Sequence, residues 1–228
     1  ATNVVFLKHI IRSIAPKFGY TACFMSKPFG DLPGSGIHVH YSLVNEQNEN
    51  IFDNETPEGS NNLRYAIGGL IKTMPEVTLI MAPHLNSYRR LVSETHAPNI
   101  ISWGYENRTV ALRVPGGDNK SRRIEHRVAG GDANPYLLFT AILGAALKGI
   151  EDQMDAPKPI QGDAYSLNLP QLAKNWITAI ELFENDDAIK NIFPESLVAN
   201  LILTKKQEFK QLDKITSADK WKYYINSI

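Results

Sequence analysis

Residues 34–43, GSGIHVHYSL, join a glycine-rich bend to a run in which polar and apolar residues alternate. Successive side chains of a β-strand point to opposite faces, so this run predicts a strand with two different sides. The polar side would carry His38, His40 and Ser42, and the apolar side Ile37, Val39, Tyr41 and Leu43. The stretch therefore predicts one face that can bind an ion and one that can pack into a core.

Two later stretches repeat this alternation. In residues 121–128, SRRIEHRV, one face would carry Arg123, Glu125 and Arg127, and the other Ile124, His126 and Val128. In residues 109–114, TVALRV, Arg113 would lie opposite Val110, Leu112 and Val114. Three strands, each with one apolar face and one charged face, predict a sheet whose charged face lines a site.

The remaining residues have mainly helical periodicity. Apolar residues spaced three or four apart predict helices, and Pro, Gly and capping residues mark the helix ends. A first helix would be capped by Thr2 or Asn3, and a second would start at Thr56-Pro57-Glu58 and end at Pro75. The other expected helices cover about residues 135–150, 171–183, 187–193, 195–212 and a segment after Thr216-Ser217. We expect the helix of residues 135–150 to be central and buried, because it is apolar almost all round. Residues 20–26 predict a short buried strand, 77–82 are ambiguous, and 86–99 predict a loop.

Composition limits the classes of partner. The chain has 228 residues, of which 43% are hydrophobic, enough for a sizeable core in one large or two small domains. Lys and Arg total 24, and Asp and Glu also total 24, so no net charge draws the chain to nucleic acid or a membrane surface. No apolar run approaches the roughly 18 residues of a membrane span. With one cysteine, Cys23, an internal disulfide is impossible, and we expect a cytoplasmic protein.

Histidine and carboxylate side chains on the predicted strands suggest a divalent ion. Two histidines on one strand face also occur as hydrogen-bonded core or surface residues. His38 and His40 alone therefore do not distinguish a metal site from this ordinary role. Glu125 on a similar strand favours Mg²⁺ or Mn²⁺, which accept mixed nitrogen and oxygen ligands and keep waters and substrate oxygens.

Several arginines lie near the apolar strand residues, where a buried guanidinium needs an anion. They are Arg90, Arg108, Arg113, Arg123 and Arg127. Ordinary salt bridges with Glu94, Glu106 and Asp118 are one explanation. Phosphate is the other, and the glycines and Glu125 favour it, because phosphoryl transfer needs cations around the phosphate oxygens. The absence of GxxxxGKS, and of GxGxxG after a strand, argues against a P-loop or dinucleotide fold.

Four ordered motifs within residues 33–150 resemble those of the glutamine synthetase family. They are PGSGIHVHYSL, NSYRRLV, ISWGYENRTVALRVP and RRIEHRVAGGDANPYLLFTAILGAALKGIE. The chain looks like the C-terminal catalytic part of this family, and SWGYENRT and RVAGGDANPY are most similar to its γ-glutamylpolyamine synthetase branch. The resemblance implies an α+β fold, with a curved, mainly antiparallel sheet backed by helices and a helical C-terminal portion.

The resemblance also implies a domain arrangement. Residues 1–228 would form one catalytic domain, in which residues 1–153 hold the sheet and the site and residues 163–228 are helical. Family members have in addition an N-terminal β-grasp domain and further metal-binding glutamates, and they form homo-oligomers. Because these parts are missing here, we expect this chain to be a fragment that has little activity by itself.

The implied activity is ATP-dependent ligation of glutamate, through γ-glutamyl phosphate, to ammonia or a small amine. Carried over by position, His38 and Glu125 would bind Mg²⁺ or Mn²⁺, and Arg108 would stabilise the transferring phosphoryl group. The remaining implied contacts are His40, Ser42, Arg113 and Arg123 with the nucleotide, and Gly34, Arg90 and Arg127 with glutamate.

Two positions depart from the family pattern. His96 stands where the family has an acidic residue thought to receive the proton of ammonium, so we expect His96 in the catalytic set and leave the acceptor open between ammonia and an amine such as putrescine. Pro33 replaces an Asn before the Gly-Ser-Gly bend. The alternative function is a non-catalytic structural or regulatory relative, against which His38, Glu125 and the arginines argue.

Overall fold

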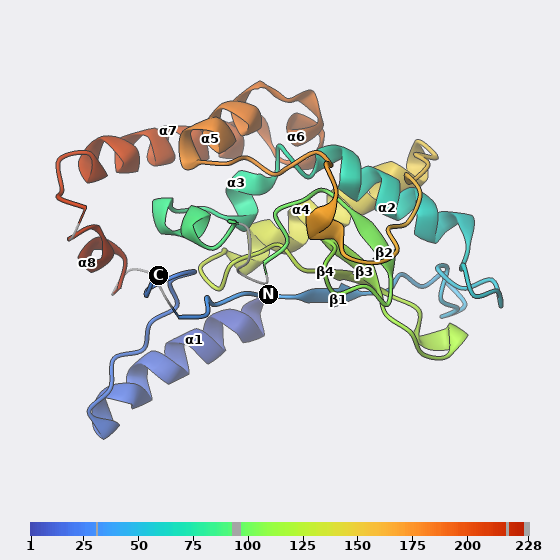
Figure 1. Cartoon of the computed structure of the whole chain (residues 1–228), viewed down its shortest axis with the longest axis horizontal. Coiled ribbons are helices and arrows are strands. Elements are labelled where there is room, and N and C mark those ends of the chain that lie inside the picture. Colours follow the sequence, from blue (N-terminus) through green and yellow to red (C-terminus); the bar gives the residue numbers. More distant parts are fainter. Residues whose placement is uncertain (31, 93–96, 218, 226–228) are drawn as a thin grey trace.

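A small four-stranded sheet lies at the centre of the computed structural model, and helices cover it (Figure 1). The structure describes residues 1–30, 32–92, 97–217 and 219–225. The helices are α1 (Thr2–Ile14), α2 (Asn61–Thr73), α3 (Thr78–Met81), α4 (Pro135–Glu151), α5 (Trp176–Asn185), α6 (Asp187–Ile192), α7 (Glu195–Leu212) and α8 (Lys220–Tyr224). Short 3₁₀ turns are η1 (Ala15–Phe18), η2 (Leu85–Arg89), η3 (Asn119–Ser121) and η4 (Ala164–Ser166).

The sheet has the strand order β1-β4-β3-β2. Its strands are β1 (Val39–Tyr41), β2 (Trp103–Tyr105), β3 (Leu112–Val114) and β4 (Ile124–His126). Strand β4 pairs antiparallel with both β1 and β3, whereas β2 pairs parallel with β3. The predicted α+β class and the mainly antiparallel sheet are therefore confirmed.

The three strands predicted from alternation are present but short. Strand β2 was missed, because residues 103–105 (WGY) have no alternation and pair only with a strand that comes later in the chain. The predicted strand at residues 20–26 is wrong, because the structure has no strand there. That segment instead runs from exposed Tyr20 to buried Met25 and Ser26, and the carbonyl oxygen of Ser26 accepts a hydrogen bond from the Ser35 amide.

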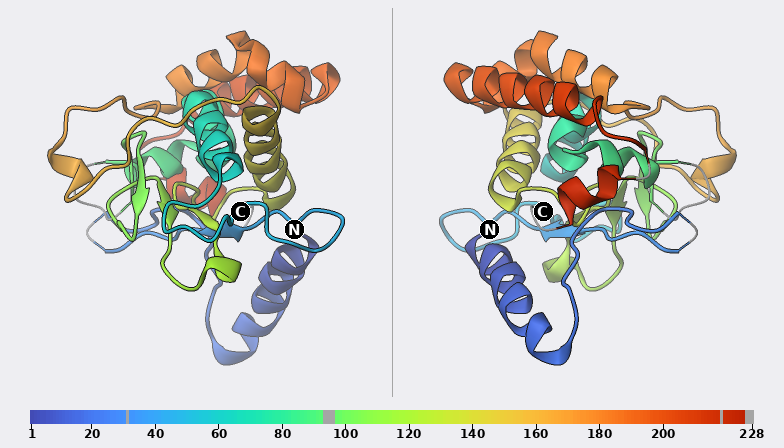
Figure 2. Two further views of the ribbon diagram at one scale, coloured as in Figure 1. Left: turned by 90° about the vertical axis from the view of Figure 1, so that its right-hand side faces the viewer. Right: turned by 90° about the vertical axis from the view of Figure 1, so that its left-hand side faces the viewer.

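The apolar backs of the strands belong to a core that they share with the helices. Leu112, Ile124 and Val128 are fully buried and lie in one hydrophobic cluster with α2, α4 and α5. Helices α2 and α4 lie side by side (Figure 2). A Cβ atom at Gly69 of α2 would lie 2.2 Å from the carbonyl oxygen of Ala145 in α4, so this close packing requires glycine.

Helix starts follow capping side chains, and three of the predicted starts need correction. Helix α2 begins at Asn61, not at residues 56–58, because Gly59 has a left-handed φ of 76° and the Ser60 side chain caps the helix. Helix α1 has no side-chain cap, so the predicted Thr2 or Asn3 cap is wrong. Helix α5 begins after its cap Asn175, since residues 171–175 are not helical.

Helix α4 starts as predicted and is buried on one side only. The Asn134 side chain accepts hydrogen bonds from the amides of Tyr136 and Leu137, with Pro135 in the first turn. Leu138, Ala141 and Ile142 are buried, whereas Leu143 and Leu147 are 38% and 48% exposed. The prediction of a central, buried helix is therefore only half right. The ambiguous residues 77–82 contain the short helix α3.

Helix α1 projects away from the rest of the chain (Figures 1 and 2). None of its residues is buried, and several of its large apolar side chains are exposed: Val5, Phe6, Leu7, Ile10, Ile11 and Ile14. Among the described residues, no helix is long and apolar enough to cross a lipid bilayer.

The imidazole of His126 lies on the apolar back of β4. It is fully buried, and neither ring nitrogen has a hydrogen-bond partner among the described residues. Burial, with a smaller contribution from the charge of His38, lowers its pKa to about 3. The folded protein therefore keeps this imidazole neutral at pH values where the unfolded chain protonates it.

We predict that His126 destabilises the chain in mild acid. Between pH 6.5 and about 3 the unfolded state binds a proton that the folded state does not, so the free energy of unfolding falls as the pH falls, by about 1.4 kcal/mol per pH unit. His126→Leu should remove this slope in denaturant titrations from pH 7 to pH 4.5. An unchanged slope would contradict the assignment; a smaller remaining slope is expected from His38, whose pKa is also lowered by burial.

Candidate functional site

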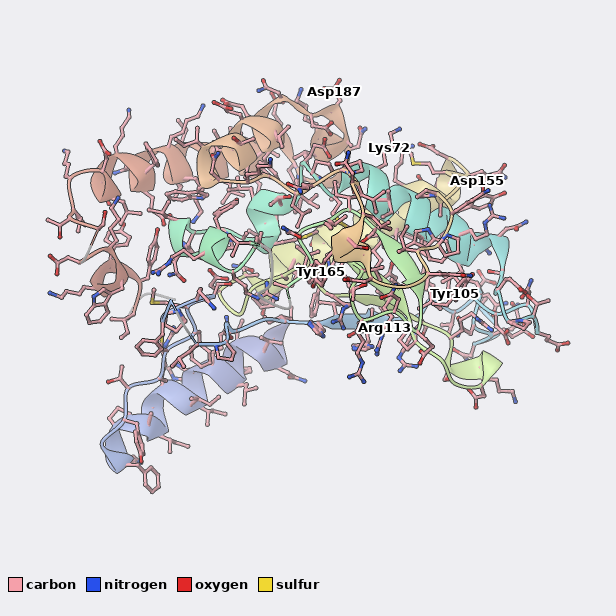
Figure 3. The ribbon with its side chains drawn as sticks, in the orientation of Figure 1. Lys72, Tyr105, Arg113, Asp155, Tyr165 and Asp187 are labelled. Carbon is pink, nitrogen blue, oxygen red and sulfur yellow. The ribbon has the colours of Figure 1, made fainter. Side chains whose placement is uncertain are left out.

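The register of the sheet sets three polar side chains side by side. His40 of β1 lies opposite Glu125 of β4, and Glu125 lies opposite Arg113 of β3. Directly opposed side chains in a sheet are about 5 Å apart at Cβ and can therefore touch. Because strand side chains alternate, His38 and Arg127, each two residues along, share the same face. Figure 3 shows Arg113 on the side of the strands away from α2.

Glu125 is the centre of this face. Its side chain is 3% exposed, and its Oε2 lies 2.5 Å from Nε of Arg113. Its Oε1 lies 2.8 Å from Nη1 of Arg127, 3.0 Å from Nδ1 of His38 and 3.6 Å from Nε2 of His40. One buried carboxylate therefore contacts four basic side chains, from strands β1 and β3 and from the residues that flank β1 and β4.

The surroundings set the protonation of this cluster. Burial raises the pKa of Glu125, but Arg127, Arg113 and the two histidines outweigh burial, so the net pKa is lowered and Glu125 is ionised near neutral pH. Burial and Arg127 lower the pKa of His38, which is therefore neutral. Since the carboxylate only accepts hydrogen bonds, the proton of neutral His38 sits on Nδ1, and Nε2 has a lone pair.

The residues predicted to bind nucleotide lie at and beyond this cluster. Nε of Arg123 donates to Nδ1 of His40 at 3.4 Å. Arg113 pairs with Glu125 through Nε, so the N–H groups of its two terminal nitrogens are additional hydrogen-bond donors. Ser42 lies just past the end of β1, is exposed and lines a polar groove formed by residues 42–62 with Lys120. The structure brings His40, Arg113 and Arg123 together and sets Ser42 at the edge.

Arg90 lies over the glycine-rich bend. It is 6% exposed, and its Nη1 donates to the carbonyl oxygen of Val128 at 2.7 Å. A Cβ atom at Gly36 would lie 2.5 Å from Nη2 of Arg90, and one at Gly34 would lie 2.6 Å from the carbonyl oxygen of Ser26. Glycine at position 36 therefore makes room for the guanidinium group, and glycine at position 34 lets the bend approach the Ser26 backbone.

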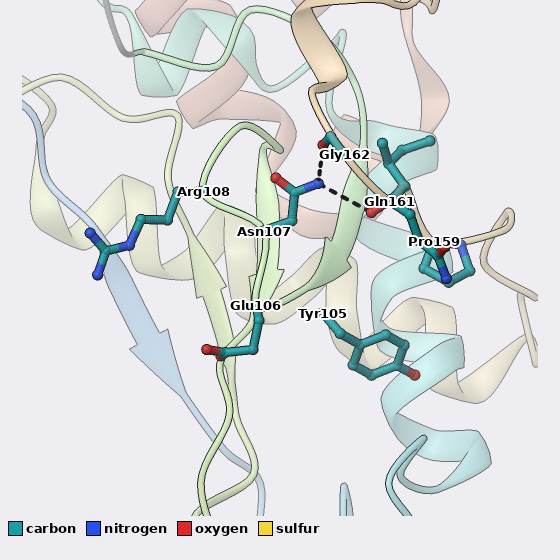
Figure 4. Close-up of a pocket in the computed structure, with 8 residues that line it drawn as sticks. Tyr105, Glu106, Asn107, Arg108, Pro159, Gln161 and Gly162 are labelled. Carbon is teal, nitrogen blue, oxygen red and sulfur yellow. Dashed lines mark hydrogen bonds between the residues drawn. The ribbon is translucent and has the colours of Figure 1, made fainter.

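The side chain of Arg127 contacts the backbone of Arg108. Nη2 of Arg127 donates to the carbonyl oxygen of Arg108 at 3.0 Å. The Arg108 side chain is exposed and, in Figure 4, points away from the opposite wall of the pocket formed by Pro159, Gln161 and Gly162. Both terminal nitrogens of Arg127 thus have protein partners, and the roles predicted for Arg127 and Arg108 stay predictions.

The segment after α4 forms part of the site, which the sequence did not indicate. Residues 157–162 lie along β2: the amide of Ile160 donates to the carbonyl oxygen of Trp103, and Nε1 of Trp103 donates to the carbonyl oxygen of Pro157. Nδ2 of Asn107 donates to the carbonyl oxygens of Ile160 and Gly162 (Figure 4).

Tyr165 follows this segment. Burial raises its pKa and Arg127 and Arg90 lower it, so its phenol lies within electrostatic reach of both arginines. A single tyrosine after a proline-containing stretch gives no sequence signal for such a position.

Among the described residues, Glu106 and Asp118 form no ion pair with the arginines around Glu125. Glu106 instead accepts a hydrogen bond from the Gly116 amide, and Asp118 accepts one from the Ser121 amide. Glu94, the third partner considered, and His96 lie outside the described residues.

The described residues offer two possible ligands for a divalent cation. Neutral His38 and ionised Glu125 are in the protonation states that a metal ligand needs. The described residues contain no group of three or more His, Cys, Asp or Glu side chains that could hold an ion. His38 and Glu125 therefore fit a partial site, where Mg²⁺ or Mn²⁺ would need oxygens from elsewhere.

Comparison with known families decides what this arrangement belongs to. The family model described as glutamine synthetase, catalytic domain, matches residues 1–224. The chain belongs to the glutamine synthetase family.

Relatives within the glutamine synthetase family use different acceptors. The chain is 39% identical over 185 residues to γ-glutamylputrescine synthetase PuuA of Escherichia coli K12, which covers 81% of this chain and 39% of the relative. It is 34% identical over 220 residues to the glutamine synthetase of Thermotoga maritima, and the match covers 92% of this chain and 50% of the relative. In structure it resembles GmaS in complex with ADP, with a TM-score of 0.84 and 32% identity over 95% of this chain and 52% of that one. The chain thus spans about half the length of these family members or less.

We predict that Glu125 is essential for stability. Glu125→Ala would leave the buried guanidinium groups of Arg113 and Arg127 without their anion, which should lower the free energy of unfolding by about 3–5 kcal/mol. Urea denaturation measures this. The control is Glu184→Ala, which breaks the exposed pair with Lys206 and should cost at most about 1 kcal/mol. Equal losses in the two variants would contradict a special role for Glu125.

Proposed function

We propose that this chain is the catalytic part of an ATP-dependent ligase that joins the side-chain carboxylate of glutamate to an amine. A carboxylate oxygen of glutamate attacks the γ-phosphorus of ATP, the bond to ADP breaks, and γ-glutamyl phosphate forms. The amine nitrogen then attacks the acyl carbon, phosphate leaves with the bonding electrons, and the amine loses a proton. The first step makes the carbonyl reactive, because phosphate is a far better leaving group than hydroxide.

The cluster around Glu125 is the observation that supports this proposal most. It gathers positive charge from Arg113, Arg127 and Arg123 on one open face, with a single buried carboxylate between them. The face is therefore suited to a polyanion such as a nucleotide triphosphate. Positive groups fixed in advance around phosphate oxygens stabilise charge in the transition state without reorganising.

The geometry supports separate places for the two substrates. His40, Arg113 and Arg123 would contact the phosphates of the nucleotide, with Ser42 further along β1. Arg90 over the glycine bend would hold glutamate, with the Gly34 backbone beside it. Arg127 would orient Glu125 and Arg108 as well as contact glutamate, and Arg108 would reach the transferring phosphoryl group.

The proposed metal site depends on the nucleotide. When bound, a divalent cation would neutralise charge on the transferring phosphate. His38 and Glu125 are the proposed ligands, and the guanidinium groups around them oppose binding of a bare cation. Phosphate oxygens would offset that repulsion and complete the coordination.

We predict that the 228-residue chain binds Mn²⁺ only together with ATP. Calorimetric titration with MnCl₂ alone should give no saturable binding, whereas the preformed Mn·ATP complex should bind more tightly than ATP without metal. His38→Gln should remove this advantage of Mn·ATP and leave ATP binding itself unchanged, with Glu184→Gln as the control. Saturable Mn²⁺ binding without nucleotide would contradict the model, and absence of all nucleotide binding in the full-length protein would favour a non-catalytic relative.

We further propose an alkylamine acceptor. The support is the 39% identity with a relative named for putrescine, against 34% with a glutamine synthetase. An extended diamine would need a longer acceptor site than ammonia.

The acceptor is tested with the full-length protein. In a phosphate-release assay with glutamate and ATP, we expect kcat/KM for putrescine at least tenfold above that for ammonium, with ethanolamine as a third amine. Turnover with ammonium alone would remove the alkylamine proposal and leave the ligase. Absence of phosphate release with every acceptor would contradict both the alkylamine proposal and the ligase proposal.

Three finer expectations are proposals as well. With one carboxylate in the described metal site, the 228-residue chain alone should have little ligase activity. The exposed apolar face of α1 supports burial against another protein surface, as in a homo-oligomer of the full-length protein. The equal numbers of acidic and basic residues and the single cysteine support a cytoplasmic location.

A further inference from the structure

A buried polar network joins the C-terminal helices to the segment that leads to Arg90. Its members are His84, at the start of η2, Lys205 and Glu208 of α7, and Tyr224 of α8. Oε1 of Glu208 lies 3.1 Å from Nδ1 of His84 and accepts a hydrogen bond from the Tyr224 hydroxyl at 3.0 Å. Its Oε2 lies 2.8 Å from Nζ of Lys205.

The charges of this network are shielded from water. The side chains of Lys205 and Glu208 are 8% and 10% exposed. Burial raises the pKa of Glu208, but His84 and Lys205 outweigh it, so the net pKa is lowered and the carboxylate is ionised. A buried, ionised carboxylate with three partners fixes their relative positions, because losing Lys205 would leave its charge uncompensated and losing either other partner would leave a buried oxygen short of a hydrogen bond.

Tyr224 connects this network to the backbone of η2. Its hydroxyl accepts a hydrogen bond from the Leu85 amide at 3.3 Å and donates to Glu208. Leu85 is the first residue of η2, and Arg90 directly follows the last. The C-terminal helix thus holds the start of the turn at whose end Arg90 lies.

The other side of η2 is attached to the sheet region. Asn86 exchanges two hydrogen bonds with the backbone of Lys27, and Ser87 donates to the buried carboxylate of Asp132 at 2.5 Å. The Arg90 amide donates to the carbonyl oxygen of Ser87. The position of Arg90 therefore follows from attachments of η2 on two sides.

Packing between η2 and α8 is incomplete. A cavity of about 630 Å³ lies between them, lined by Tyr88 and Arg89 from η2 and by Lys220 and Trp221 from α8. Tyr224 makes the contact beside this cavity: it is 2% exposed, its ring centroid lies 5.1 Å from that of the His84 ring, and its hydroxyl hydrogen-bonds to Leu85 and Glu208. Figure 1 shows α8 beside the segment that follows α3.

We propose that Tyr224 and Glu208 are positioning residues for glutamate binding: they hold η2, and through it Arg90, in the orientation that accepts the substrate carboxylate. This inference rests on the proposed function, because it assigns glutamate to Arg90. It gives helices α7 and α8 a role in the site, although none of their described residues contacts Glu125.

The test uses Tyr224→Phe in the full-length protein, a change that removes one oxygen and keeps the ring. Amide hydrogen exchange of the peptide covering residues 84–92 should become faster by about three- to tenfold, the range expected for loss of one buried hydrogen bond. KM for glutamate should rise by a similar factor, while KM for ATP and kcat stay within twofold. Glu208→Gln should act in the same direction. Lys206→Met, on the same helix but in an exposed pair, is the matched control and should change neither quantity.

The two readouts separate the possible failures. Unchanged exchange in residues 84–92 of Tyr224→Phe would overturn the proposal whatever the kinetics show. Faster exchange with unchanged KM for glutamate would overturn the positioning role. A parent enzyme with no ligase turnover would overturn the proposed function instead, and the exchange result would still decide whether α8 holds η2.

Discussion

A single buried carboxylate, Glu125, holds the charged face of the sheet together. It is 3% exposed and lies between His38 just before β1, Arg113 of β3, and Arg127 just after its own strand. Without it, guanidinium groups with little access to water would repel one another across the strands. With it, they have fixed positions and still leave an excess of positive charge on one face. Stability and the affinity for anions therefore have the same physical origin.

The alternation of side chains made the charged face predictable. His38, His40, Arg113, Glu125 and Arg127 each lie on the predicted side of their strands, because a strand period of two is a local property of the sequence. The proximity of His40, Glu125 and Arg113 depends in addition on register, which the sequence alone did not show. Strand β2 could not be predicted, since its three residues have no pattern of their own and pair in parallel with β3.

Long-range polar contacts were equally out of reach of sequence reasoning. His84 and Glu208 are 124 positions apart, and nothing in the composition of either neighbourhood distinguishes them from surface residues. The starts of α2 and α5 were placed too early for a simpler reason. At those helices the caps Ser60 and Asn175 determine the first turn, and they lie some residues after the first helix-like positions. The motifs resembling the glutamine synthetase family gave the implied roles, which pattern reasoning alone did not.

The segment at residues 157–162 has a consequence for solubility. Strand β2 is an outer strand of the sheet, and an outer strand with unpaired amides and carbonyls can recruit a strand from another molecule. Here the Ile160 amide donates a hydrogen bond to the carbonyl oxygen of Trp103, and the Trp103 indole donates one to the carbonyl oxygen of Pro157. A short proline-containing stretch of the same chain thus covers this edge strand. We expect it to suppress β-pairing between molecules at that edge.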